Sequence, residues 1–152
     1  MLPEHKWRQY GLPDAKIKGI VVHNTNSFLS AEQLENWMLN NTTSQGCHFL
    51  VDHKEVRQVM PLDWSVFSTG KGMDFGNISC VAIEVCTNIS SELYLQGERR
   101  AVELIKQLMR EFNLTQDDIY YHRDFDPYVN CPAQILSRYK TKKEFLNLLK
   151  GD

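Results

Sequence analysis

The chain has 152 residues, which suits one globular domain with a sizeable core, and 42% of them are hydrophobic while 24% are charged. Seventeen basic and nineteen acidic residues give a formal net charge of -2, so no positive field favours nucleic acid or an anionic membrane surface as a partner. No apolar stretch approaches the roughly 18 residues that a membrane span needs. We therefore expect a single domain over residues 1–152, with no nucleic-acid and no membrane partner.

Strand and helix patterns alternate along the chain. In chain order they predict a strand over residues 17–23, a helix that follows Ser30 and ends before residue 40, strands over 47–52, 55–60 and 80–86, a long helix over 98–114, a short strand over 119–122 and a final helix from 141 to 149. A glycine-rich loop over 68–77 lacks the spacing of a phosphate-binding loop. This order predicts one α/β domain with a mixed sheet.

The first predicted helix carries the clearest local signal. Ser30 and Gln33 form a capping box, in which the serine hydroxyl accepts from the Gln33 backbone amide. Leu34, Trp37 and Met38 then recur at helical spacing, which predicts one apolar face.

Three residues that are far apart in the sequence form a candidate metal site. His23 ends an apolar strand, and His122 and Cys131 lie in one segment near the end of the chain. Imidazole and thiolate are ligands that Zn²⁺ prefers, and three protein ligands leave a fourth position open for water, as in catalytic zinc sites. Spacing alone leaves open a second interpretation, in which the histidines simply lie at strand ends.

The cysteines favour the metal interpretation over a disulfide framework. Four of them are spread along the chain, and a core of this size needs no covalent crosslinks. We expect all four to be reduced, with one bound to metal: Cys47, Cys80, Cys86 and Cys131.

Glu84 stands in the middle of an apolar strand, where an ionised carboxylate is costly to bury without partners. Strand alternation puts Ala82 and Glu84 on one face of the strand and the larger apolar residues on the other. A catalytic zinc needs a nearby base that takes a proton from the attacking water, and Glu84 is the candidate. The alternative is a glutamate at a sheet edge in a surface salt bridge.

Four blocks of sequence together carry a family resemblance. They are residues 21–25 with His-Asn-Thr, 47–56, 81–86 with Ile-Glu-Val-Cys, and 122–136 with Cys-Pro-Ala-Gln-Ile-Leu. In this order the chain resembles the zinc-dependent N-acetylmuramoyl-L-alanine amidases of the type 2 family. It is most similar to the amidase domains of endolysins and autolysins from phages and hosts of the Gram-positive Firmicutes.

The resemblance implies a central mixed β-sheet flanked by helices, the fold shared with peptidoglycan recognition proteins, in a single amidase catalytic domain. It implies hydrolysis of the amide between N-acetylmuramic acid and L-alanine of the stem peptide. Zn²⁺ would be held by His23, His122 and Cys131, and Glu84 would be the catalytic carboxylate.

Three further residues are candidates for contact with the substrate. Asn24 and Thr25 directly follow a predicted ligand, so we expect them to line the substrate groove. His48 either contacts substrate as well or is a buried histidine whose hydrogen bonds are satisfied, and both interpretations stay open.

The resemblance also implies a partner and a place of action. We expect a monomer that binds Firmicute-type bacterial peptidoglycan. Residues 1–6 lack the apolar core of an export signal, so we expect a protein of phage or prophage origin that is made in the bacterial cytoplasm and acts on the wall after release. Two alternatives are a peptidoglycan-binding module without turnover and a zinc hydrolase that cleaves anhydro-muropeptides in the cytoplasm.

The chain departs from the family pattern at three positions. Val129 stands where relatives usually have lysine, Ser68 where they often have histidine, and Cys47 where an aromatic residue is common. We expect these positions to contact substrate or the oxyanion of the transition state. That charge would then be stabilised by zinc alone, or by Lys71 or Arg123.

Overall fold

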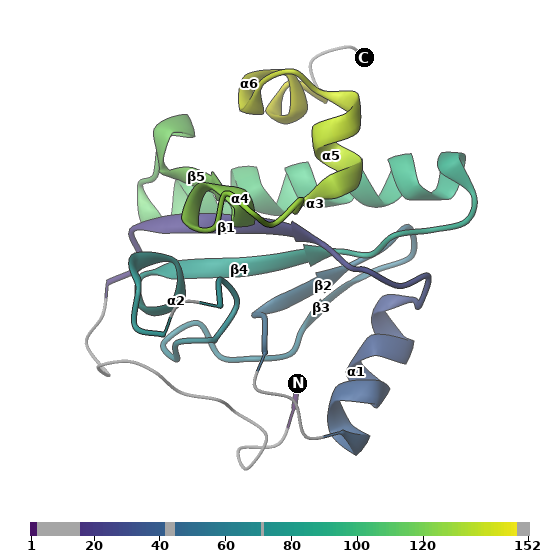
Figure 1. The fold of residues 1–152 in the computed structure, drawn as a ribbon, viewed down its shortest axis with the longest axis horizontal. Helices are drawn as coiled ribbons and strands as arrows, with labels where there is room; N and C mark the ends of the chain where they lie inside the picture. Colours follow the sequence, from purple (N-terminus) through teal and green to yellow (C-terminus); the bar gives the residue numbers. More distant parts are fainter. Residues whose placement is uncertain (3–15, 42–44, 71, 149–152) are drawn as a thin grey trace.

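The computed structural model describes residues 1–2, 16–41, 45–70 and 72–148. These residues form a five-stranded sheet in the order β3-β2-β4-β1-β5 (Figure 1). All neighbouring strands are parallel except β2 and β3, so the predicted mixed sheet is confirmed. The strands are β1 (Gly19–Asn24), β2 (Phe49–Val51), β3 (Val56–Gln58), β4 (Cys80–Val85) and β5 (Ile119–Tyr121).

Helices flank this sheet, as the family resemblance implies. The long helix α3 runs along the sheet, α1 lies beyond its β2–β3 side, and α5 and α6 lie above β1 in the view of Figure 1. Within the described residues, no helix combines the length and the apolar character needed to cross a membrane. The helices are α1 (Ala31–Asn40), α2 (Phe75–Ile78), α3 (Ser91–Phe112), a 3-10 turn (Gln116–Asp118), α4 (His122–Phe125), α5 (Ala133–Arg138) and α6 (Lys142–Leu146).

The start of α1 follows the predicted capping box. The Ser30 hydroxyl accepts from the Gln33 amide at 3.2 Å, and the Gln33 side chain accepts from the Ser30 amide at 2.9 Å. Asp52, in the turn after β2, accepts from the Ala31 amide at 2.9 Å. This bond ties the N-terminus of α1 to the sheet.

The long helix α3 begins earlier than its apolar pattern predicts, at Ser91 instead of residue 98. Ser90 caps it by accepting from the Leu93 amide, and Asn113, with a φ of 55°, ends it in the left-handed conformation. Gly97 interrupts the helical pattern in the sequence, but a side chain there would meet the Asp52 backbone at 3.4 Å. Gly97 therefore lies inside α3 and packs against the β2–β3 turn, although glycine has a low helix propensity.

Three short helices, α2, α4 and α5, lie where no helix was predicted. Within the glycine-rich loop, Asp74 caps α2 by accepting from the Asn77 amide. Helix α5 follows Pro132 inside the predicted site segment. The final helix α6 ends at Leu146, and the predicted end at Leu149 lies outside the described residues.

The two faces of the sheet have different surroundings, as the alternation in β4 predicts. Val81, Ile83 and Val85 belong to the main core, together with α3, α5 and α6. Ala82 belongs to a smaller core on the opposite face, together with residues of α1. Glu84 shares the Ala82 face, so its carboxylate lies on the side of the sheet that is less completely covered.

Candidate metal centre

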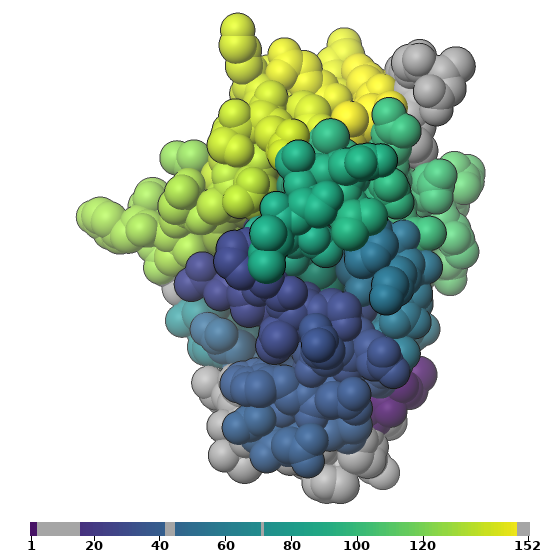
Figure 2. All heavy atoms as spheres, turned by 90° about the vertical axis from the view of Figure 1, so that its right-hand side faces the viewer, coloured from purple at the N-terminus to yellow at the C-terminus, as the bar shows by residue number. Residues whose placement is uncertain are grey.

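A cavity of about 920 Å³ opens where the parallel strands β1 and β4 end. Open α/β sheets bind ligands at this edge, where the carboxyl ends of the strands meet. Figure 2 shows this side of the molecule, with the blue α1 in the lower half and the yellow-green C-terminal segments above. The lining comes from the ends of β1 and β4, residues 25–29, α1, residues 45–47 and residues 129–134.

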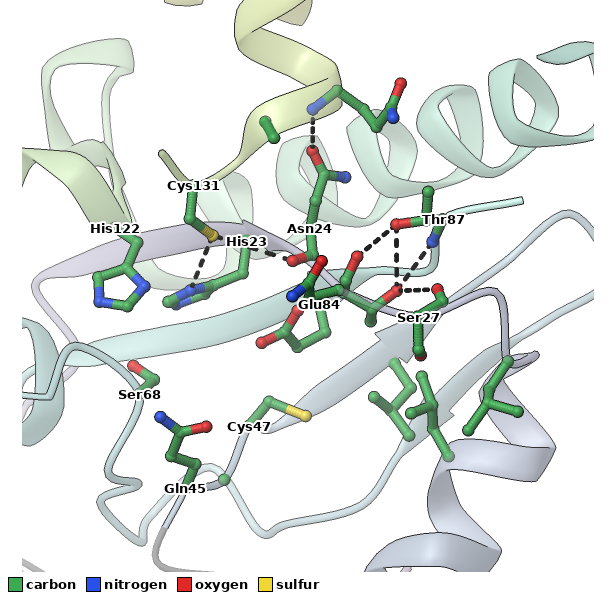
Figure 3. Close-up of a pocket in the computed structure, with 18 of the residues that line it drawn as sticks. His23, Asn24, Ser27, Gln45, Cys47, Ser68, Glu84, Thr87, His122 and Cys131 are labelled. Atoms are coloured by element: carbon green, nitrogen blue, oxygen red, sulfur yellow. Dashed lines mark hydrogen bonds between the residues drawn. The ribbon is translucent and has the colours of Figure 1, made fainter. Parts of the chain in front are cut away.

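His23, His122 and Cys131 meet at one end of the cavity (Figure 3). One ligand atom from each lies within 4.8 Å of the others. The Cys131 sulfur is 3.7 Å from Nδ1 of His23, and the two imidazole centroids are 4.9 Å apart. The residues lie at the end of β1, at the start of α4 and just before α5, so the fold brings the three predicted ligands together.

The donor set fits Zn²⁺. A nitrogen at about 2.0 Å and a sulfur at about 2.3 Å from one tetrahedral ion lie about 3.5 Å apart, close to the separation of Cys131 and His23. Burial, with a contribution from nearby His122, lowers the pKa of His23 to about 3, so its imidazole is neutral. Burial raises the pKa of Cys131 to about 12. A cation in the cluster would favour its thiolate form.

His122 is oriented by the glycine-rich loop. Its Nε2 donates to the Thr69 carbonyl at 3.1 Å, which leaves Nδ1 as the nitrogen with a free lone pair. The Thr69 amide in turn donates to the buried Asn77 side chain at 2.9 Å, and its hydroxyl donates to Asp74. The loop therefore orients a ligand imidazole, a role that the sequence did not suggest.

Glu84 lies beside the cluster, paired in register with His23. It lines the cavity, and its Oε2 atom is buried with no hydrogen-bond partner among the described residues. Burial raises the pKa of the carboxyl group to about 8. Within the described part of the chain Glu84 forms no ion pair, so the structure does not support the alternative of a surface salt bridge.

The predicted substrate residues separate into two groups. Asn24 and Thr25 line the cavity, although both side chains already make hydrogen bonds within the protein. His48 is only 1% exposed and does not line the cavity. Its Nδ1 accepts from the Ala82 amide at 2.9 Å and its Nε2 donates to the Trp64 carbonyl at 2.7 Å. Of the two interpretations of His48, the structure favours the buried histidine with satisfied hydrogen bonds, because both ring nitrogens have partners inside the protein.

The three positions that depart from the family pattern all line the cavity: Cys47, Ser68 and Val129. Arg123, a candidate for stabilising transition-state charge, is exposed and is absent from the lining. Lys71, the other candidate, lies outside the described residues.

Sequence reasoning missed the apolar end of the cavity. Trp37, on the predicted apolar face of α1, is 46% exposed and lines this end, and Phe28 is 65% exposed. The apolar pair Phe28-Leu29 within the polar segment before α1 was the available signal. The side chains that form this apolar end are Phe28, Leu29, Leu34, Trp37 and Met38.

Comparison with known proteins agrees with this geometry. Residues 13–134 match the family model described as N-acetylmuramoyl-L-alanine amidase, which is most of the chain. The chain belongs to this amidase family. It is 33% identical to the amidase CwlA of Bacillus subtilis over 134 residues, or 85% of this chain and 49% of that protein. It is 34% identical to XlyB of the same species over 120 residues, or 78% of this chain and 38% of that protein.

This amidase domain thus spans half or less of the length of these two curated relatives. Solved structures of similar size match it more completely. The catalytic domain of XlyA superimposes with a TM-score of 0.84 at 27% identity, covering 96% of this chain and 95% of that one. The PlyG catalytic domain gives 0.86 at 25% identity, covering 99% and 92%. The fold expected from the resemblance is therefore confirmed.

Proposed function

We propose that this domain is a zinc-dependent amidase that hydrolyses the amide between N-acetylmuramic acid and L-alanine in bacterial peptidoglycan. One observation carries the proposal: His23, His122 and Cys131 converge beside a carboxylate with a buried oxygen that has no partner among the described residues. Membership of the family supports the amidase reaction, and the names of its relatives supply the bond that is cleaved.

Zn²⁺ bound by the three ligands would supply a Lewis acid and lower the pKa of a bound water from about 15.7 to about 7. Glu84 is the acidic residue in the described lining, so it takes the proton from the attacking water. The same carboxyl group then returns the proton to the departing L-alanine nitrogen. His122, held by the Thr69 carbonyl, keeps a fixed tautomer throughout.

The cavity extends beyond the reacting centre and is much less polar at its far end. We infer that part of the substrate that does not react lies over this apolar end, between the segment before α1 and α1 itself. Trp37 and Phe28 offer exposed aromatic faces there, which suit the apolar faces of sugar rings or stem-peptide side chains. Contacts this far from the scissile bond would hold the substrate equally before and during the reaction.

We also propose a role in the lysis of Firmicute-type cell walls. One structural relative is a mutant endolysin from Bacillus subtilis, which is 28% identical with a TM-score of 0.84 and covers 96% of this chain and 95% of that one. A lytic enzyme of this kind would be made in the cytoplasm and would reach the wall after release.

The test is digestion of purified Bacillus walls, with anhydro-muropeptides as a second substrate. We expect newly exposed L-alanine amino termini without a matching rise in reducing sugar, inhibition by a chelator and recovery with Zn²⁺. New reducing ends, or amino termini from other stem residues, would reject the assignment in favour of a glycosidase or an endopeptidase. Cleavage of anhydro-muropeptides alone would reject the role in lysis.

A further inference from the structure

Asn24 lies between two of the zinc-ligand candidates. It directly follows His23 in β1, and its side chain points toward α5, as Figure 3 shows. The Oδ1 atom accepts from the Gln134 amide at 2.9 Å and from the Ile135 amide at 3.2 Å. Both amides belong to the first turn of α5, the helix that follows Cys131 and Pro132. One side chain therefore connects the strand that carries His23 to the helix that follows Cys131.

The side-chain nitrogen of Asn24 also forms hydrogen bonds. Its Nδ2 donates to the Val85 carbonyl at 3.2 Å and to the Tyr94 hydroxyl at 2.8 Å. A primary amide has two donor hydrogens and two acceptor lone pairs, so these four bonds use its full capacity. Asn24 is held in one orientation and retains no free polar group for a substrate.

A second set of polar contacts lies at the far end of α5. Tyr94 lies one helical turn before Glu98 in α3, and the Glu98 side chain is fully buried. The Tyr139 hydroxyl donates to Oε2 of Glu98 at 2.7 Å, and the Arg138 guanidinium lies 3.9 Å from Oε1. Arg138 and Tyr139 are the last residue and the C-cap of α5, and the Arg138 guanidinium lies 5.4 Å from the centroid of the Tyr94 ring. The first turn of α5 is therefore tied to Asn24, and its end contacts Tyr94 and Glu98 of α3.

We propose that Asn24 is a positioning residue that sets the separation of His23 and Cys131, and hence the affinity and geometry of the zinc site, through its bonds to α5. The Asn24 carbonyl adds a weak contact, 3.9 Å from the Cys131 sulfur. This inference rests on the proposed zinc site. It replaces the predicted substrate contact of Asn24, because the four bonds face the protein.

The experiment compares Asn24→Asp and Asn24→Ala with the parent domain. Asn24→Asp keeps the shape and the acceptor for α5 but places a carboxylate against the Val85 carbonyl, while Asn24→Ala removes every bond. The zinc dissociation constant is measured by chelator competition, and the sulfur-to-metal charge-transfer band is recorded after cobalt substitution. Melting temperatures are measured on the metal-free proteins.

We expect zinc affinity to fall about 10- to 100-fold in Asn24→Ala, the usual range for loss of a group that orients a ligand. The cobalt charge-transfer band should weaken or shift, because the cysteine ligand moves. Tyr94→Phe, which keeps the bonds to α5, should have a smaller effect. Thr87→Val is the matched control: Thr87 lines the same cavity and bonds to Thr25 without touching α5, so zinc affinity should stay unchanged.

A lower melting temperature with unchanged zinc affinity and cobalt spectrum would overturn the positioning role and leave Asn24 as a packing residue. Equal loss of affinity in Thr87→Val would also overturn it. These failures leave the proposed function intact, since the parent domain still binds zinc. If the parent domain binds no zinc, the proposed function and this inference both fail.

Discussion

Two histidines, His23 in β1 and His48 just before β2, are both buried, yet their surroundings indicate different functions. His23 and His48 are 2% and 1% exposed, and burial lowers the pKa of each, to about 3 and about 4. Around His48, the Ala82 amide and the Trp64 carbonyl occupy both ring nitrogens. Around His23, one nitrogen faces the Cys131 sulfur and the other has no partner among the described residues.

The difference lies in what surrounds each imidazole. Both ring nitrogens of His48 form hydrogen bonds within the protein. These bonds join the segment before β2 to β4 and to the loop at Trp64. The structure leaves His23 with unused coordinating capacity beside a cavity. Since native proteins rarely leave buried polar atoms without partners, such an atom next to other metal-binding side chains indicates a binding site.

The largest expected effect comes from replacing one of the predicted zinc ligands, His23 or Cys131. His23→Ala and Cys131→Ser should each reduce zinc from about one per chain to a small fraction, and wall hydrolysis to background, because the site cannot be completed. Metal analysis measures the zinc content, and the release of L-alanine amino termini measures wall hydrolysis. Full zinc occupancy in both variants would refute the site assignment.

The next largest effect concerns the carboxylate beside His23. Glu84→Gln keeps the size and removes the proton acceptor, so turnover should fall by about 100-fold or more. Zinc content and melting temperature should barely change, because Glu84 is not a ligand and forms no ion pair in the described structure. A large drop in melting temperature with normal activity of the folded fraction would assign Glu84 a structural role instead.

A substitution at His48 should have the opposite effect: it should lower stability and leave zinc binding unchanged. His48→Ala removes the side chain that bonds the Ala82 amide and the Trp64 carbonyl and leaves a buried void, so the free energy of unfolding should fall by about 2 kcal/mol. Zinc bound per folded chain should stay the same. Denaturant unfolding and metal analysis on one preparation decide this, and loss of zinc from folded protein would return His48 to the functional site.

The smallest effect is expected at the apolar end of the cavity. Trp37→Ala should raise KM several-fold on wall fragments and change kcat by less than about twofold, because the contact is made equally before and during the reaction. Ile89→Ala is the control, since Ile89 is 83% exposed and lies outside the cavity lining. An equal KM for Trp37→Ala and the parent domain would remove this end from substrate binding.

Local patterns in the sequence were sufficient for much of this protein. The capping box at Ser30 and the alternation in β4 depend on neighbours within a few residues, and both appear in the structure as predicted. The family resemblance predicted His23, His122 and Cys131 as zinc ligands, and one ligand atom of each lies within 4.8 Å of the others. The order and type of the main elements followed from the same local patterns.

Only the tertiary structure decided the rest. Helix α3 extends through Gly97, which packs against the Asp52 backbone, and nothing near Gly97 in the sequence records that contact. His48 and Asn24 were candidates for substrate contact, and their hydrogen-bond partners, brought in from β4 and α5, make them part of the framework. Whether a polar side chain is available for chemistry depends on which distant groups already occupy it, and folding alone brings those groups together.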